Sequence, residues 1–372
     1  MKKKLLALVC ALALTFSFAG CTISTPDTVG SIGDFEITSG MYLLAQYGAY
    51  QQAAQLAGTD QDTTDVKAFL KETITTDSDS GETAVVSDYV AQQTQQTLET
   101  LAAVDARFKA LGGELTAEQL STADRYAQQM MDQYGDTYTA NGIGLETLQR
   151  FERILLKSTD LLDLVYGTNG ETPVSDADLT SHLENKMYKL AYYSIPLYNS
   201  STYAFADDDQ KDTMLRLAQA AVDSYNASAP ADAVSQFTAF HEVSSAALSG
   251  IYAVLDSTVP TDGTASLQTE LLSSSTLDSA FSTEGSADTI RSLSFGQAAA
   301  VQYSSLSMML AVRLDPLDGA ALDDVRAQVL ADMKSDELQD ALAAYGASMQ
   351  HSLDSSAMGK LPARKIAAAS SN

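Results

Sequence analysis

Apolar residues recur every three or four positions over long stretches of the first half of the chain, a spacing that is typical of amphipathic helices. These stretches run over residues 39–57, 84–111, 116–135 and 145–167. Before them, residues 29–38 alternate apolar and polar side chains around Gly33-Asp34, which predicts a β-hairpin. Residues 59–82 are acidic, and we expect a solvated loop there around a short helix over 66–74. The pattern predicts a helical lobe over residues 29–170.

The pattern changes after a turn-rich segment at residues 167–173. Beyond it, the sequence predicts strands at 189–197, 299–303 and 308–314, an amphipathic helix over 207–227 and a partly helical segment over 267–281. Together these elements predict a small mixed α/β domain over residues 175–315.

A final helix is predicted from Leu322 to Tyr345, and an extended tail follows it. A lone terminal helix needs apolar surface to pack against, and the first lobe is the nearest supply. We therefore expect residues 318–367 to pack back onto that lobe. The predicted fold class is α+β, mainly α, with a discontinuous helical lobe from the N- and C-terminal segments and an inserted small α/β domain.

The first 20 residues have the organisation of an export signal. Lys2–Lys4 form a basic start, and an apolar run from Leu5 to Phe18 follows that is too short for a comfortable membrane span. Cys21 directly after Ala-Gly resembles the lipobox of bacterial lipoproteins, which implies that Cys21 is lipidated and becomes the mature N-terminus. The alternatives are an ordinary signal peptide cleaved nearby and a short anchor helix. With lipidation, residues 21–28 form a tether, and the protein is extracytoplasmic and lipid-anchored to a bacterial cell membrane.

The chain is strongly acidic, since 22 Lys and Arg against 48 Asp and Glu give a net charge of −26. Loss of residues 1–20 would remove three lysines and leave −26 − 3 = −29. Such a protein repels phosphate backbones and anionic lipid surfaces, so nucleic acid is not an expected partner and membrane attachment would come from the lipid on Cys21. Cys10 lies in the removed segment, which leaves no pair of cysteines for an internal disulfide.

No motif indicates a cofactor, a metal or a covalent mechanism. Residues 77–88 partly match a calcium-binding loop, but the glycine falls one place early and the twelfth position is Asp88 rather than Glu. The spacing of histidine and cysteine does not fit zinc, and nucleotide-binding and hydrolase motifs do not occur. We therefore expect no cofactor and no metal.

Five segments, taken in order, carry a resemblance to a known family. They are VGSIGDFEITSGM at 29–41, PVSDADL at 173–179, YKLAYYSI at 188–195, LSFGQ at 293–297 and MLAVRL at 309–314. In this order they resemble the SurA and PrsA family of extracytoplasmic folding factors, in which a parvulin-type peptidyl-prolyl isomerase domain lies between helical N- and C-terminal parts. The resemblance implies a chaperone or foldase whose partners are unfolded exported polypeptides.

The chain departs from the family where catalysis is concerned. Active parvulins carry one histidine in the first strand of the domain and one in the last, and these frame the prolyl pocket. Around these positions this chain has Tyr192, Tyr193 and Ser194 in the first strand and Ser307 and Met308 in the last. The histidines His182, His241 and His351 fall outside both predicted strands. Tyr193 and Met308 are the candidates for a vestigial pocket. Because isomerisation requires only a shaped apolar pocket that favours the twisted amide, enzymatic activity stays open.

The sequence is compatible with three functions. The leading one is a membrane-anchored chaperone that holds unfolded exported chains in an apolar groove of its helical lobe and has a degenerate parvulin-like domain. The others are an active prolyl isomerase with a non-histidine pocket and a lipoprotein that binds a small solute or another partner. Aromatic and methionine side chains of the lobe are expected in its core rather than in contact with clients: Met41, Tyr42, Tyr47, Met130, Met131 and Tyr134. The oligomeric state is left open.

Overall fold

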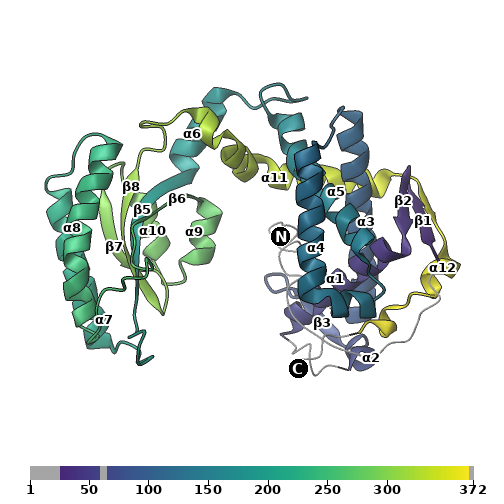
Figure 1. Ribbon diagram of the computed structural model, residues 1–372, viewed down its shortest axis with the longest axis horizontal. Coiled ribbons are helices and arrows are strands. Elements are labelled where there is room, and N and C mark those ends of the chain that lie inside the picture. Colours follow the sequence, from purple (N-terminus) through teal and green to yellow (C-terminus); the bar gives the residue numbers. More distant parts are fainter. Residues whose placement is uncertain (1–25, 59–64, 368–372) are drawn as a thin grey trace. The chain divides into compact units, whose positions relative to one another are not determined.

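The computed structural model describes residues 26–58 and 65–367. Helices dominate and the sheets are small and antiparallel, so the predicted α+β, mainly α, class is confirmed. The chain divides into two compact units (Figure 1): unit 1 comprises Met1–Pro173 with Lys334–Asn372, and unit 2 comprises Val174–Met333. Within the described ranges, no helix combines the length and the apolar character that a membrane crossing requires.

Unit 1 is built mainly from long helices. These are α1 (Ser39–Ala57), α3 (Val86–Ala110), α4 (Ala117–Ala140), α5 (Leu145–Tyr166) and the C-terminal half of α11 (Leu322–Ser348). Helix α1 packs against α3, and α5 packs against both α3 and α4 (Figure 1). A capping box of Thr116 and Gln119 starts α4. The four long helices predicted for this part of the chain are therefore present.

A three-stranded sheet joins both ends of the chain within unit 1. The predicted hairpin consists of β1 (Thr28–Ile32) and β2 (Phe35–Thr38), and β9 (His351–Leu353) pairs with the other edge of β1. Gly30 has φ +121°, and a Cβ at this position would lie 2.2 Å from the carbonyl oxygen of Ser352. Only glycine permits this close approach of β1 to β9. The tail after α11 also contains α12 (Ser355–Gly359) and a 3₁₀ turn, η2 (Ala363–Lys365), where the sequence predicted an extended chain.

The acidic segment before α3 differs from its prediction. Residues 59–64 lie outside the described residues, but α2 (Val66–Phe69) is shorter than predicted and is followed by a hairpin of β3 (Thr73–Asp77) and β4 (Glu82–Val85). Ile74 is buried, and Gly81 has φ +71° in the turn. The run of β-branched residues 73–76 favours this strand over the predicted helix. No group of three or more His, Cys, Asp or Glu that could hold a metal occurs in the part of the chain that the structure describes.

Unit 2 is a four-stranded antiparallel sheet with helices on both faces. The strand order is β6 (Gln268–Ser273), β5 (Met187–Pro196), β8 (Ser307–Leu314) and β7 (Ala298–Gln302). Helices α7 (Asp208–Asn226) and α8 (Ala233–Ala253) cover one face, whereas α9 (Ser274–Ala280) and α10 (Ser286–Ser292) lie on the other (Figure 1). Helix α6 (Asp176–Lys186) leads into β5.

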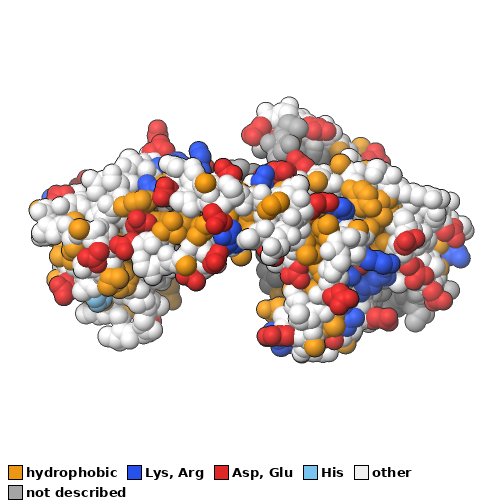
Figure 2. All heavy atoms as spheres, turned by 90° about the horizontal axis from the view of Figure 1, so that it is seen from above, with side chains coloured by type: hydrophobic (Ala, Val, Ile, Leu, Met, Phe, Trp, Pro, Cys, Tyr) orange, Lys and Arg blue, Asp and Glu red, His pale blue; other side chains and the backbone are white. Residues whose placement is uncertain are grey.

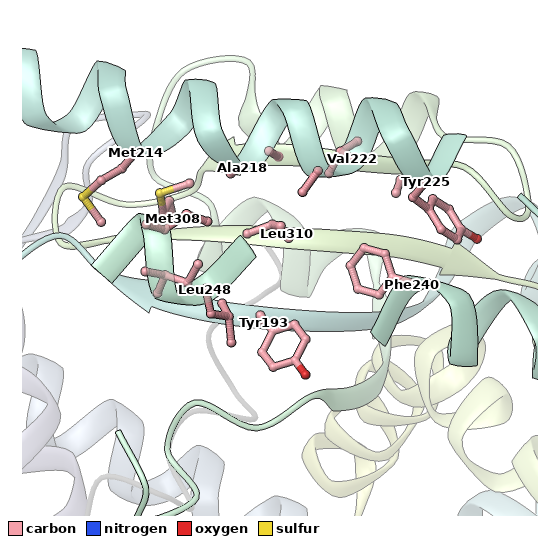
Figure 3. Packing of buried hydrophobic residues seen from close by; sticks show 14 of the residues in the cluster. Tyr193, Met214, Ala218, Val222, Tyr225, Phe240, Leu248, Met308 and Leu310 are labelled. Carbon is pink, nitrogen blue, oxygen red and sulfur yellow. The ribbon is translucent and has the colours of Figure 1, made fainter. Parts of the chain in front are cut away.

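The main core of unit 2 lies between the sheet and the pair α7 and α8. Figure 3 shows Met214 and Val222 of α7 and Phe240 of α8 turned toward the sheet residues Tyr193 and Leu310. A second, smaller core on the other face contains Leu277, Phe281 and Ile290. Helix α8 was not predicted. Residues 267–281 are partly helical, as predicted, because they contain α9, but the strand β6 before α9 was not predicted. Both α8 and β6 contribute residues to the pocket of unit 2.

A candidate binding pocket in unit 2

A cavity of about 660 Å³ opens on the sheet face that carries α9, and all of its walls belong to unit 2. Strands β5, β6 and β8, helices α8 and α9 and four loops contribute to it. Its lining residues include five aromatic rings and two carboxylates: Tyr192, Tyr198, Tyr252, Phe281, Tyr303, Asp262 and Glu270. We call this cavity the sheet pocket.

The alternation of side chains along β5 and β8 decides which residues enter the sheet pocket. Tyr192 and Ser194 of β5 line it, and so does Met309 of β8. Their neighbours Tyr193 and Met308 point to the opposite face, into the core under α7 and α8 (Figure 3). Successive residues of a strand face opposite sides of the sheet, so a shift of one position exchanges pocket and core.

The structure therefore places both predicted pocket residues in the core. Tyr193 is 2% exposed and Met308 is 1% exposed, and neither lines the sheet pocket. The Tyr193 hydroxyl is 2.7 Å from Nδ1 of His241 on α8, and the two rings are stacked. The pocket face carries Tyr192 and Met309 instead. Cys21, the predicted lipidation site, lies outside the described residues.

Hydrogen bonds and ring contacts hold the walls of the sheet pocket. The hydroxyls of Ser194 and Tyr303 are 2.9 Å apart, and the ring of Tyr303 lies 5.5 Å from that of Phe281. On the β6 side, the Tyr192 hydroxyl donates to Oε1 of Gln268 at 3.0 Å. These contacts join β5, β6, α9 and the loop before β8 into one wall.

Two carboxylates influence the tyrosines of the pocket. Burial raises the pKa of Tyr192 to about 12, and the nearby carboxylate of Glu270 adds to the rise. Burial also raises the pKa of Tyr252, and the negative charge of Asp262 adds to it. Asp262 accepts hydrogen bonds from the hydroxyl and backbone N–H of Thr264, which lower the pKa of its carboxyl. At neutral pH the phenols are therefore neutral hydrogen-bond donors, and Asp262 is ionised.

The sheet pocket has the chemistry of a binding site. Its lining contains no His, Cys, Lys or Arg among the described residues. His182 is paired with Asp332, and His351 lies 3.6 Å from Glu99 of unit 1. Hydroxyl groups and aromatic rings can bind a peptide segment without covalent chemistry. The sequence indicated the location of this pocket through two strand positions, around residues 192–194 and 307–308. Glu270 was not identified, because the strand that carries it was not predicted.

The aromatic and methionine side chains of unit 1 divide into two groups. Met41 and Tyr47 are buried, as predicted, whereas Tyr42, Met130, Met131 and Tyr134 are only half-buried. On α4, the exposed Tyr126 and the half-buried Met130 are four residues apart and lie on one side of the helix, and Tyr134 follows after four more residues, as the non-helical residue that kinks α4. We call these three residues the α4 strip.

Comparisons with known proteins give matches among solved structures only. No family model matches the chain, and no curated protein matches it. Similar solved structures include the foldase protein PrsA from Streptococcus pneumoniae, at 13% identity over 77% of this chain and 97% of that chain, with a TM-score of 0.39. The foldase protein PrsA from Lactococcus lactis matches at 14% identity over 74% and 90%, with a TM-score of 0.34. PrsA from Bacillus subtilis matches at 10% identity over 78% and 98%, with a TM-score of 0.28. Because these TM-scores and identities are low, the function of this chain is inferred below from its own residues.

Proposed function

We propose that this protein is an extracytoplasmic chaperone of the foldase type that binds unfolded exported polypeptides. The observation that carries the proposal is the sheet pocket. It opens between the first and last strands of unit 2, where the sequence resemblance puts the prolyl pocket of a parvulin domain, and it has hydroxyl and aromatic walls in place of the two histidines. In this proposal, the sheet pocket holds an extended segment of the unfolded polypeptide.

Client holding by unit 1 rests on the α4 strip. Tyr126 is 45% exposed, and Met130 and Tyr134 are half-buried beside it. Flexible and polarizable methionine and amphipathic tyrosine side chains adapt to varied apolar partners. Acidic side chains are spread over the visible face of each unit (Figure 2), and the net charge of −26 keeps such a holder soluble while apolar side chains stay accessible.

Anchoring through a lipid on Cys21 is part of the same proposal. Residues 21–28 would then tether the described units to the membrane, and the acyl chains would supply the attachment that an acidic protein cannot obtain from anionic lipids. Mass spectrometry of the membrane-extracted protein tests this directly. The proposal expects a diacylglyceryl adduct on Cys21, and an unmodified chain cleaved elsewhere would contradict it.

A second candidate function is prolyl isomerisation without histidine. Twisting of the amide needs a fitted pocket and groups that favour the twisted form, not a nucleophile. The bond between the hydroxyls of Ser194 and Tyr303 uses only one of their two protons, so the pair supplies a hydrogen-bond donor inside the cavity. These groups are the specific reason to retain isomerisation as an alternative.

One experiment separates these functions. The chain from Thr22 onward keeps every described residue, and it would be assayed for suppression of aggregation of an unfolded protein and for isomerisation of a short Xaa-Pro peptide. Suppression without isomerisation supports the chaperone. Isomerisation supports the second candidate. Absence of both activities would contradict both and favour a lipoprotein that binds a small solute or another partner.

A further inference from the structure

The lining of the sheet pocket is unbalanced in charge. Asp262 and Glu270 both belong to it, and no Lys or Arg does. Among the described residues, neither carboxylate lies within ion-pair distance of a basic side chain. Both are exposed, and each acts on a tyrosine of the pocket, so their negative charge faces the cavity. The pocket thus offers anionic groups that the described part of the chain does not neutralise.

The aromatic rings complete a cation-binding surface. Tyr192, Tyr252 and three further rings line the same cavity as the two carboxylates. Ring faces attract Lys and Arg side chains, and a nearby carboxylate strengthens the attraction. An anionic or purely apolar occupant would leave these carboxylates without a partner. The chemistry of the walls therefore selects a positive charge.

An apolar lip borders one end of the sheet pocket. It consists of Tyr203, Phe205 and Leu306, which are 76%, 70% and 47% exposed. The lip is attached to the pocket, because Phe205 contacts the lining residue Tyr198 and Leu306 accepts a hydrogen bond from the N–H of Leu197 at 2.8 Å.

The conformation of the lip is fixed by its own chain. Tyr203 has φ +56°, an unfavourable value for a residue with a side chain, and Asn199 holds the loop through bonds to the N–H groups of Ser201 and Thr202. The positive φ of Tyr203 costs backbone free energy, and the exposed side chains leave apolar surface in contact with water. The lip is an apolar surface next to an anionic pocket.

We propose that the sheet pocket binds a Lys or Arg side chain of an extended client segment, held by the aromatic rings, Asp262 and Glu270, while an apolar residue two positions away in the segment rests on the lip. This inference depends on the proposed function, and it names the class of segment that the pocket prefers. The net charge of −26 attracts basic segments in general, whereas the pocket distinguishes them locally.

Labelled peptides test the preference. Three short peptides would be identical, with one Phe, except that the second residue after Phe is Lys, norleucine or Glu. Binding to the chain from Thr22 onward would be followed by fluorescence anisotropy. We expect the Lys peptide to bind about fivefold more tightly than the norleucine peptide, with the Glu peptide weakest, and the preference to shrink at high salt. Equal affinities for the three peptides would overturn the inference.

Matched charge variants test whether the preference for the Lys peptide arises from the carboxylates of the sheet pocket. Asp262→Asn with Glu270→Gln should reduce the difference between the Lys and norleucine peptides to less than about twofold. The control variant, Asp212→Asn with Glu242→Gln, removes the same charge from exposed positions on α7 and α8 and should keep the preference. Equal losses in both double variants would show a general effect of net charge and overturn the pocket assignment.

A second pair of variants tests the lip. Phe205→Ser should weaken binding of all three peptides by about threefold, because each contains the same Phe. Val234→Ser, at a position that is 69% exposed on α8, is the control and should have no effect. Equal effects of the two variants, or none from Phe205→Ser, would contradict the lip assignment.

Suppression of client aggregation by the wild-type protein separates this inference from the proposed function. If the wild-type protein suppresses aggregation but shows no Lys preference, the inference fails and the chaperone proposal stands. If it neither suppresses aggregation nor binds any peptide, both fail.

Discussion

At the residue scale, function in unit 2 depends on which face of a strand a side chain occupies. The sequence predicts β5 and β8 and identifies the neighbourhood of the pocket, but strict alternation offers two faces and does not say which one α7 and α8 will cover. Tyr193 and Met308 were assigned to the pocket because they lie around the strand positions where the family carries its histidines. Tyr192 and Met309 occupy the pocket instead.

Replacement of the two adjacent tyrosines should therefore have opposite consequences. Tyr193→Ala removes a ring that is 2% exposed and should lower the free energy of unfolding of unit 2 by about 3–5 kcal/mol. Tyr192→Ala should cost much less stability but weaken peptide binding. Urea unfolding followed by tyrosine fluorescence measures the first effect, since the chain has no Trp, and anisotropy measures the second. The reverse ranking of stability would contradict the assignment of faces.

Buried tyrosines also predict an alkaline limit to stability. Burial raises the pKa of Tyr47, Tyr89 and Tyr225 to about 12, above the ordinary value near 10 that applies in the unfolded chain. The unfolded state then loses these protons first, so stability is fully present below about pH 10 and falls as the pH rises toward 12. Urea unfolding at about pH 9 and pH 11 measures the loss.

Tyr89→Phe is the matched variant for this prediction. Tyr89 is 7% exposed, so the substitution keeps the ring in the core and removes only the titrating hydroxyl. The decrease in stability between the two pH values should be smaller in Tyr89→Phe than in the wild-type protein. A stability that is constant or rises over this range would contradict the prediction.

At the element scale, the long helices follow from periodicity alone, whereas short elements depend on tertiary contacts. Helices α1, α3, α4 and α5 were predicted from their three-and-four spacing, and the β1 and β2 hairpin from its alternation. The Ser- and Ala-rich sequence of α8 hides a buried row at 240, 244, 248 and 251, because Ser and Ala mark neither face clearly. The hairpin of β3 and β4 was missed in an acidic segment that suggested a solvated loop around a short helix, and the strand β6 was missed in a segment that was predicted to be partly helical.

The contact of α11 with α3 gives a prediction within unit 1. A Cβ at Gly346 would lie 2.3 Å from the carbonyl oxygen of Glu99, so Gly346→Ala must push the two helices apart and should cost about 1–3 kcal/mol. Gly48→Ala in α1 is the control, since a Cβ there meets nothing within 4 Å, and it should stabilise the helix by up to about 1 kcal/mol. Thermal unfolding of both variants checks the order. A neutral Gly346→Ala would contradict the close packing.

The α4 strip gives a functional prediction at the same scale. Tyr126→Ser with Met130→Ser should reduce suppression of client aggregation several-fold with little change in thermal stability, because Tyr126 is 45% exposed and Met130 is half-buried. Gln128→Ser with Gln129→Ser, at exposed polar positions of the same helix, is the control for helix propensity. Equal effects of the two double variants would remove the strip from the proposed function.

At the scale of the whole molecule, the chain contributes both of its ends to unit 1 and its middle to unit 2. Strand β9 pairs with β1 across almost the whole length of the sequence, and the side-chain amide of Asn141 exchanges hydrogen bonds with the backbone of Ala367. The need of a terminal helix for apolar surface was predictable. The register of β9 was not, because three residues carry too little pattern to predict a strand.

The central claim is that the sheet pocket holds unfolded polypeptide, and site-specific photo-cross-linking tests it most directly. p-Benzoylphenylalanine would be introduced at Ser200, an exposed residue of the pocket lining, and at Asp212 on α7 as the control. Each variant of the chain from Thr22 onward would be irradiated with the same client protein in its unfolded and folded states. We predict cross-links from position 200 to the unfolded client alone and few from position 212. Equal cross-linking from both positions, or none from position 200, would contradict the claim.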